Sequence, residues 1–190
     1  MIVLASASPR RAELLATLGV SFEVEPSAVD EAVLDGEAPA ALVERLAREK
    51  AREVSARRPD AWVLGADTVV TIDGRALNKP LDDDDAQEML RSLSGRWHEV
   101  LTGVALARGG EAREVRSVST RVRFVAMDAV TIDAYVATGE GRDKAGAYAV
   151  QGIGSGLIDR IDGSYTNVVG LPTCETVQLL VRHRVLESFP

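Results

Sequence analysis

Two arginines stand at the start of a predicted helix, where the backbone disfavours cations. After an apolar run at residues 2–5, Ser8 suits the helix N-cap and Pro9 suits the first helical position. Arg10 and Arg11 then fall in the first turn. The helix dipole makes a cation there unfavourable by about 0.3–1 kcal/mol. The two side chains therefore either point into water or bind an anion.

A carboxylate lies inside an otherwise apolar strand, in the stretch "WVLGADTVV". Burying Asp67 among apolar side chains is costly unless it is paired or binds a metal ion. We expect Asp67 and Thr68 to interrupt the strand, because Gly65 and Ala66 let the backbone turn and another group approach. An aspartate that only holds a turn is the alternative. We favour a binding role, because α/β proteins bind ligands at the ends of sheet strands.

Further charged residues could complete a site of this kind. Lys79 precedes Pro80 in "LNKPLD", which keeps it extended. Lys50 lies on a predicted long helix, where the local pattern favours a solvated lysine, and Glu31 is a loop carboxylate of undecided role. Four cations and two carboxylates would suit a polyphosphate bridged by a divalent ion. Oxygen ligands suit Mg²⁺ or Mn²⁺.

Several other kinds of site are not supported by the motifs. The sequence has no zinc-ligand spacing, no Walker loop and no G-x-S-x-G, and "QGIGSG" lacks the strand–turn–helix context of a dinucleotide loop. The acidic run 82–85 suits a helix start, which favours a structural role over a metal site. His98 is expected in a strand and His183 in a helix, neither near a plausible partner.

Composition narrows the class of protein further. The chain of 190 residues has 29 acidic and 22 basic residues, a net charge of −7, which argues against a nucleic-acid partner. The single cysteine, Cys174, predicts a reducing cytoplasm and a buried structural thiol. No apolar run reaches the roughly 20 residues of a membrane span, and no signal peptide is recognisable, so no membrane partner is expected.

Strand and helix patterns alternate along the chain. Gly109 and Gly110 join two long alternating strands as a hairpin, so part of the sheet must be antiparallel. The class is therefore α/β with a mixed sheet. Helices are predicted at residues 8–18, 38–58, 82–95, 128–139 and 171–188, and strands at residues 2–5, 20–25, 61–77 and 97–127.

Seven motifs, in order, carry a resemblance over nearly the whole chain. They are "LASASPRR", "LAREKA", "GADTVV", "LNKPLDDDDAQEMLRSLSG", "HEVLTGVAL", "GEGRDKAGAYAVQG" and "DGSYTNVVGLP". Residues 3–180 resemble the Maf family of nucleoside triphosphate pyrophosphatases. The resemblance implies one domain over residues 1–190, with a mixed twisted sheet, flanking helices and two lobes around a substrate cleft. It also implies metal-dependent hydrolysis of a nucleoside triphosphate to the monophosphate and pyrophosphate.

The resemblance also assigns roles at the motif positions. Asp67 matches the family's general base, and Glu31 with Asp67 matches its metal side. The phosphate-handling positions are Ser6, Arg11, Lys50 and Lys79. The positions that set base specificity are Arg10, Thr68 and Gln151.

"GADT" together with "AGAYAVQG" resembles the branch that acts on dTTP and UTP and removes non-standard nucleotides. One alternative is the sister branch, which acts on 7-methyl-GTP; Thr68 and Gln151 favour pyrimidines instead. The other alternative is a nucleotide-binding regulator of septation with little turnover. Such a regulator would have lost the carboxylate at position 67 or the lysines, and this chain keeps both. A homodimer stays an open expectation.

Overall fold

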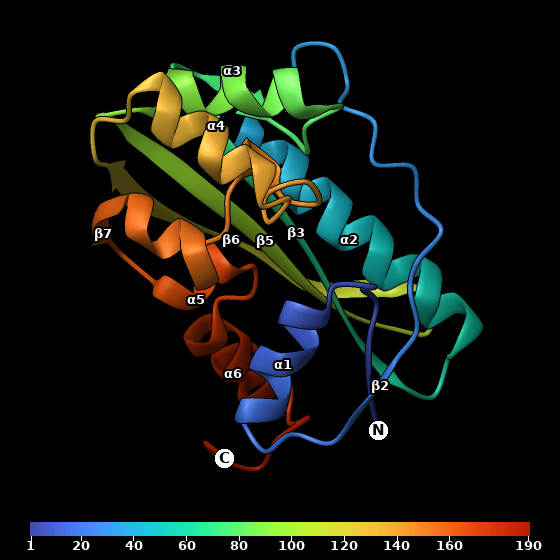
Figure 1. Cartoon of the computed structure of the whole chain (residues 1–190). Coiled ribbons are helices and arrows are strands. Elements are labelled where there is room, and N and C mark those ends of the chain that lie inside the picture. The colour runs from blue at the N-terminus through green and yellow to red at the C-terminus, as the bar shows by residue number, and fades with distance from the viewer. The chain divides into compact units, whose positions relative to one another are not determined.

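Parallel strands and antiparallel hairpins share one sheet in the computed structural model, which describes residues 1–190 (Figure 1). The strand order is β2-β1-β3-β5-β6-β7, with β4 paired to β3. The strands are β1 (Ile2–Leu4), β2 (Phe22–Val24), β3 (Trp62–Ile72), β4 (Arg75–Leu77), β5 (Trp97–Arg108), β6 (Glu111–Phe124) and β7 (Ile158–Asp162). The predicted α/β class with a mixed sheet is confirmed.

The helices alternate with these strands along the chain. They are α1 (Pro9–Thr17), α2 (Pro39–Arg57), α3 (Asp83–Leu93), α4 (Ala129–Ala137), α5 (Tyr165–Val169) and α6 (Thr173–Arg182). Two short 3₁₀ helices, η1 (Ala145–Ala147) and η2 (Gly152–Leu157), lie in the glycine-rich region. None of the helices is both long enough and apolar enough to cross a membrane.

The chain forms two compact units, each assembled from segments that are distant in sequence. The first unit contains Met1–Asp67, Thr102–Val118 and Gly170–Pro190. The second unit contains Thr68–Leu101 and Ser119–Val169. Strands β3, β5 and β6 contribute residues to both units.

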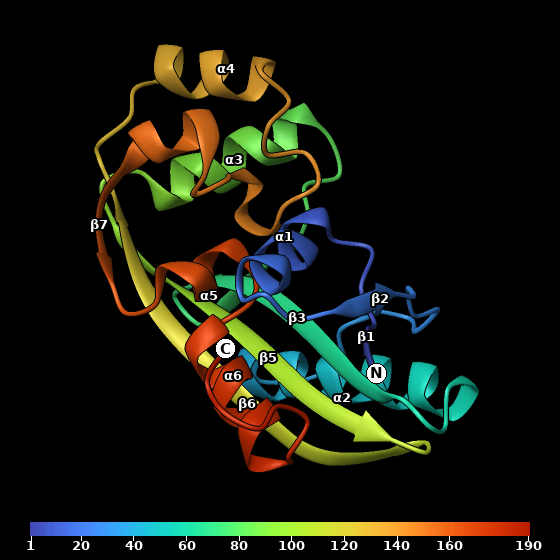
Figure 2. The same ribbon diagram turned by 90° about the horizontal axis from the view of Figure 1, so that it is seen from below.

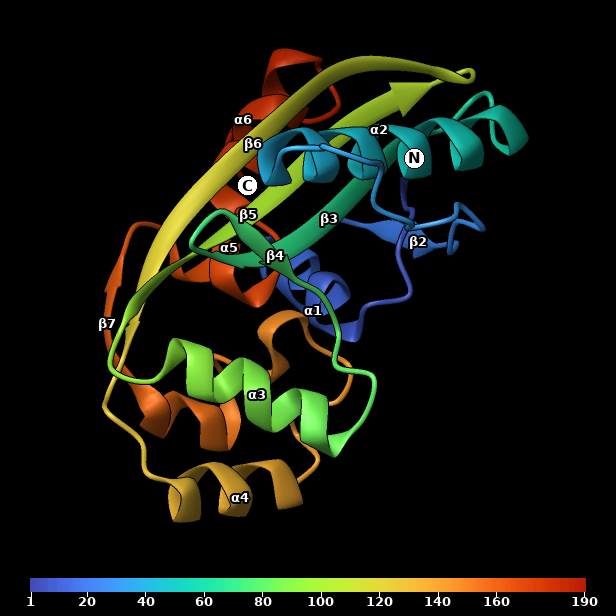
Figure 3. The ribbon, with the colours of Figure 1, turned by 90° about the horizontal axis from the view of Figure 1, so that it is seen from above.

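In the first unit, helices cover both faces of the sheet. Strand β1 is parallel to β2 and β3, and its Leu4 pairs with Val24 and Leu64. Because side chains alternate along a strand, Leu4 and Leu64 pack toward α1 and α6, whereas Val3 and Val63 pack toward α2. Figure 2 shows α1 and α6 on the near face, and Figure 3 shows α2 on the opposite one.

Two glycines let α2 lie unusually close to the sheet. A Cβ atom added at Gly65 on β3 would stand 2.3 Å from the carbonyl oxygen of Ala47. At Gly103 on β5 it would stand 2.1 Å from the carbonyl oxygen of Val43. Both contacts are with the α2 backbone, so only residues without a side chain fit at these positions.

In the second unit, α3 and α4 lie side by side and pack against one face of the strands (Figure 1). The turn between β3 and β4 has the two left-handed residues of a type I′ hairpin, Asp73 (φ 52°) and Gly74 (φ 75°), as "DG" predicts. The side chain of Asp82 accepts a hydrogen bond from the Asp85 amide and caps α3. The acidic run therefore has the structural role that its sequence predicts.

Two sequence-based expectations about local structure are wrong. Strand β3 runs without interruption through Gly65, Ala66 and Asp67, because the Asp67 carboxylate is paired by a lysine within the fold. Cys174 is exposed rather than buried. Its neighbours Val177 and Thr176 face the core, but the helical repeat turns the thiol toward solvent.

The two histidines both have partners, which is also contrary to expectation. The Nε2 atom of His98 lies 2.9 Å from the Tyr148 hydroxyl, and burial lowers the pKa of His98 to about 4. His98 is thus a neutral core residue. His183 follows the last residue of α6 instead of lying within the helix, and its Nε2 atom lies 2.9 Å from Oε2 of Glu114.

Candidate active site

Arg11 ties the start of α1 to two other parts of the first unit. Its Nη1 donates to the Ser6 hydroxyl at 3.1 Å, and its Nε donates to the carbonyl of Gly170 at 2.9 Å. Ser8 occupies the N-cap position of α1, but its side chain makes no capping bond. Its amide instead donates to the buried Ser6 hydroxyl at 3.2 Å. Arg11 is therefore held by the fold instead of extending into water.

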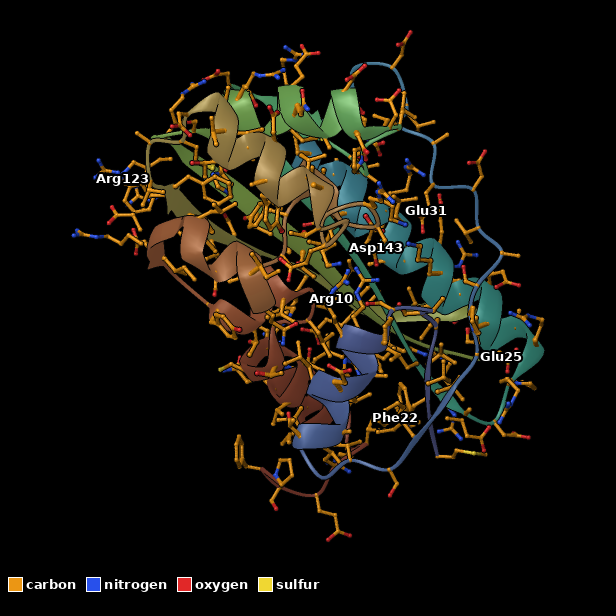
Figure 4. The ribbon with its side chains drawn as sticks, viewed as in Figure 1. Arg10, Phe22, Glu25, Glu31, Arg123 and Asp143 are labelled. Carbon is orange, nitrogen blue, oxygen red and sulfur yellow. The ribbon has the colours of Figure 1, made fainter.

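The charges around Arg11 explain why a cation is tolerated at a helix start. Burial lowers the pKa of Arg11 below its usual value, Asp67 and Glu31 raise it, and Arg10 lowers it again. Despite the net lowering, a guanidinium stays charged in proteins. Figure 4 shows Arg10 at the first turn of α1 and Glu31 on the segment that leads to α2. The charges of Asp67 and Glu31 thus partly offset the burial of Arg11 and its repulsion by Arg10.

A buried lysine is the centre of the second group of charges. Lys50 lies on α2 with a relative exposure of only 6%. Its Nζ atom is 2.5 Å from Oε1 of Glu31 and 2.7 Å from Oδ1 of Asp67. The local helical pattern, which favours a solvated lysine, is wrong at this position. The family resemblance, in contrast, places Lys50 among the site residues.

The packing of α2 on the sheet brings these three groups together. Gly65 allows the α2 backbone to approach β3, two residues before Asp67. The parallel register pairs Leu4 with Leu64, so Ser6 follows the end of β1 and Asp67 lies on the part of β3 that continues past that end. Both residues are thus close to the carboxyl end of β1, and α/β proteins bind ligands at such ends of parallel strands. The first unit therefore gathers Ser6, Arg11, Glu31, Lys50 and Asp67.

The carboxylates of Glu31 and Asp67 fit a hard divalent cation that takes its other ligands from phosphate oxygens and water. Oε1 of Glu31 and Oδ1 of Asp67 face the same point, which the Lys50 ammonium contacts. Mg²⁺ is usually bound by one or two carboxylates together with phosphate oxygens and waters. No group of three or more His, Cys, Asp or Glu side chains is arranged to hold a metal ion, so a closed, all-protein site is absent. Glu31 and Asp67 are the residues that would hold the cation.

The remaining predicted site residues belong to the second unit or flank the first group. Arg10 is half-buried beside Arg11 on α1. Thr68 is half-buried on β3, Lys79 is exposed after β4, and Gln151 is exposed at the N-cap of η2. Their roles in a common site stay predictions.

Sequence reasoning missed one contributor to the first group and was half right about another. The Gly170 carbonyl accepts from Arg11 across 159 positions of sequence, and no local pattern signals such a contact. At Gly65 the expected turn is wrong, because β3 is continuous there, but the expected approach of another group is confirmed. The group that approaches is the α2 backbone, and a glycine inside a strand pattern is a known signal of such an approach.

Comparisons with known proteins agree with the family resemblance. Residues 1–183 match the family of Maf-like proteins. A dTTP/UTP pyrophosphatase of Methylobacillus flagellatus is 53% identical over 181 residues, which are 94% of this chain and 90% of the relative. Those of Symbiobacterium thermophilum (54% over 181 residues, 95% and 93%) and Geobacter sulfurreducens (53% over 182 residues, 95% of both chains) are similarly close. The chain belongs to the family of Maf-like proteins.

Proposed function

We propose that this protein hydrolyses dTTP and UTP to the nucleoside monophosphate and pyrophosphate, using a divalent metal ion. The observation that carries the proposal is the buried Lys50 ammonium between the carboxylates of Glu31 and Asp67. Two carboxylates and a cation near the carboxyl end of the parallel strand β1 suit a polyphosphate bridged by a metal ion. The names of the three relatives support dTTP and UTP as substrates.

In this proposal, the triphosphate is bound by hydrogen-bond donors and cations. Arg11 presents a planar guanidinium, whose fork of donors matches phosphate oxygens, and the fold holds it through Ser6 and Gly170. Lys50 contributes a buried ammonium and Lys79 an exposed one. These charges stabilise the negative charge that grows on the leaving pyrophosphate.

Asp67 accepts the proton of the attacking water in the same proposal. The water attacks the α-phosphorus, the bond from that phosphorus to the bridging oxygen breaks, and pyrophosphate leaves. A divalent cation bound by Glu31 and Asp67 would neutralise phosphate charge and so make the phosphorus more electrophilic. The ion pair with Lys50 fixes the Asp67 carboxylate in one orientation.

The base is selected by hydrogen bonding. The Gln151 side chain carries both a donor and an acceptor, which match the imide edge of uracil and thymine. Cytosine and guanine present other edge patterns and would leave a polar group unpaired, which is how such a site rejects them. Arg10 and Thr68 line the base-specificity side in the family pattern.

A panel of nucleoside triphosphates tests this function. With Mg²⁺ or Mn²⁺ present, we expect pyrophosphate release from dTTP and UTP at rates well above those for CTP, GTP and ATP. Chelation of the metal should abolish the release. The products are measured by separate pyrophosphate and orthophosphate assays.

Each other outcome of the panel rejects a different part of the proposal. Orthophosphate as the primary product rejects the reaction class, and preference for 7-methyl-GTP rejects the pyrimidine branch. Tight nucleotide binding without turnover favours the alternative function, a nucleotide-binding regulator of septation. Full activity in excess chelator rejects the metal ion.

A further inference from the structure

Gln151, the residue proposed to recognise the base, lies on a segment that its own side chain does not stabilise. Gln151 is exposed at the N-cap of η2, and its side chain makes no capping hydrogen bond. The next residue, Gly152, has a φ of +69°, and a glycine by itself restricts the backbone least of all residues. An exposed glutamine on such a segment can adopt several orientations. Contacts with the backbone around it therefore determine where its Cα–Cβ bond points.

Glu140 supplies such contacts on the carboxyl side of Gln151. Its Oε1 atom accepts a hydrogen bond from the amide of Ile153 at 2.9 Å. Its Oε2 atom accepts from the amide of Gly154 at 2.7 Å and from the Tyr135 hydroxyl at 2.8 Å. One carboxylate thereby holds two consecutive backbone amides.

Tyr135 supplies the contact on the amino side of Gln151. The residue lies on α4 and is buried, with 4% exposure. Its hydroxyl donates its one proton to Glu140 and accepts a hydrogen bond from the amide of Ala149 at 3.0 Å. Tyr135 and Glu140, which we call the clamp, therefore hold the backbone on both sides of Gln151.

The clamp packs tightly against the backbone of residues 149–154. A Cβ atom at Gly152 would lie 2.2 Å from Oε1 of Glu140. At Gly154 it would lie 2.3 Å from the Ala149 carbonyl oxygen and 2.7 Å from the Tyr135 hydroxyl. The two glycines are thus needed for the backbone to reach the clamp.

The charge on Glu140 suits it to this acceptor role. Burial by itself raises the pKa of Glu140. The Gly154 and Ile153 amides, the Tyr135 hydroxyl and the Lys144 charge lower it further than burial raises it, so the net pKa is below the usual value. The carboxylate is therefore ionised at neutral pH and can accept all three hydrogen bonds. Bonds to an ionised acceptor are stronger than those between neutral groups.

We propose that Tyr135 and Glu140 are positioning residues for base specificity, which hold Gln151 in the orientation that pairs with uracil or thymine. This proposal rests on the proposed function, since it assigns the orientation of Gln151 to the clamp. A polar group discriminates between bases only if it cannot rotate to suit the wrong one. The clamp restricts that freedom without touching the substrate.

Two nearly isosteric variants test the proposal. Tyr135→Phe removes the hydroxyl that bridges Glu140 and Ala149. Glu140→Gln places an amide NH₂ where a carboxylate oxygen accepts from a backbone N–H. For each variant, the ratio of kcat/KM for UTP to that for CTP is expected to fall by about tenfold, the size of one lost or misdirected hydrogen bond. The KM for UTP should rise, while kcat at saturating UTP stays within about twofold of the wild type.

Tyr148→Phe is the matched control. It removes another buried tyrosine hydroxyl of the second unit, whose hydrogen-bond partner is His98 rather than Tyr135 or Glu140. Its ratio of kcat/KM for UTP to that for CTP should equal the wild-type ratio. Thermal melts of the three variants check that each is folded.

A double-mutant cycle separates a positioning role from a structural one. If the clamp acts through Gln151, adding Glu140→Gln to Gln151→Ala should leave the UTP-to-CTP ratio unchanged from Gln151→Ala alone. A purely structural role predicts that kcat/KM falls equally for both nucleotides, and this result overturns the proposal. A wild-type ratio in both folded clamp variants overturns it as well.

The failure of this proposal is distinguishable from the failure of the proposed function. If the wild-type protein shows no preference for dTTP and UTP over CTP, the function itself is wrong. If the wild type shows that preference and the clamp variants keep it, only the positioning role is wrong.

Discussion

Asp67→Asn is expected to lower kcat for dTTP by about 10²–10⁴-fold, the usual contribution of a general base. The amide cannot accept the proton of the attacking water, and it carries no charge to hold a metal ion. The fold should persist, because the asparagine oxygen can still accept a hydrogen bond from Lys50 Nζ, which also keeps its ion pair with Glu31. Steady-state kinetics and a thermal melt of the same preparation measure both quantities.

Asp73→Asn serves as the control for that experiment. Asp73 is also an aspartate in an ion pair, with Arg96 at 2.7 Å, but both side chains are exposed. Exposed pairs contribute about 0–1 kcal/mol, so stability and turnover should stay near the wild-type values. If Asp67→Asn retains wild-type kinetics and metal dependence, Asp67 is a structural residue and not the base.

Gly65→Ala is expected to destabilise the protein by about 3 kcal/mol or more, the upper end of the range for overpacked cores. The added Cβ atom would lie 2.3 Å from the Ala47 carbonyl oxygen and 2.8 Å from the Ala51 amide nitrogen. Both atoms belong to the α2 backbone, so the whole helix must shift to relieve the contact. Lys50 moves with it, and a displacement of about 1 Å in a catalytic group can cost about 10²-fold in rate.

Gly156→Ala provides the comparison for the stability measurement. A Cβ atom at Gly156 would meet nothing within 4 Å, so this substitution adds a methyl group without a clash. The urea midpoint should fall clearly for Gly65→Ala and remain near the wild-type value for Gly156→Ala. Equal midpoints for Gly65→Ala and the wild type would show that the contact between α2 and β3 can accommodate an added methyl group.

Elements with strong local signals could be predicted from the sequence. The amphipathic pattern predicted α2 at residues 38–58, and the structure has it at Pro39–Arg57. The "DG" and "GG" turns likewise predicted the hairpins, because each supplies the left-handed backbone that a tight turn requires. Such features depend on residues that are adjacent in the chain.

Contacts between distant segments could not be predicted from local patterns. The sequence around Lys50 contains only the alternating charges of a solvated helix. What buries Lys50 is the packing of α2 against Gly65, which brings its ammonium to Asp67, 17 positions away. The family resemblance identified Lys50 because it compares whole motifs. The residues of a motif reflect the contacts that the folded protein makes, including those between distant segments. The same limit explains β3: its continuity through Asp67 depends on the partner that the carboxylate finds in three dimensions.

Hydrolysis of dTTP in water labelled with a heavy oxygen isotope tests the central claim most directly, because it reports which phosphorus is attacked. We expect one labelled oxygen in the thymidine monophosphate and none in the pyrophosphate that is released. Mass spectrometry of the two products after a single turnover gives the answer. Label in the pyrophosphate, or thymidine diphosphate and orthophosphate as products, would contradict the account.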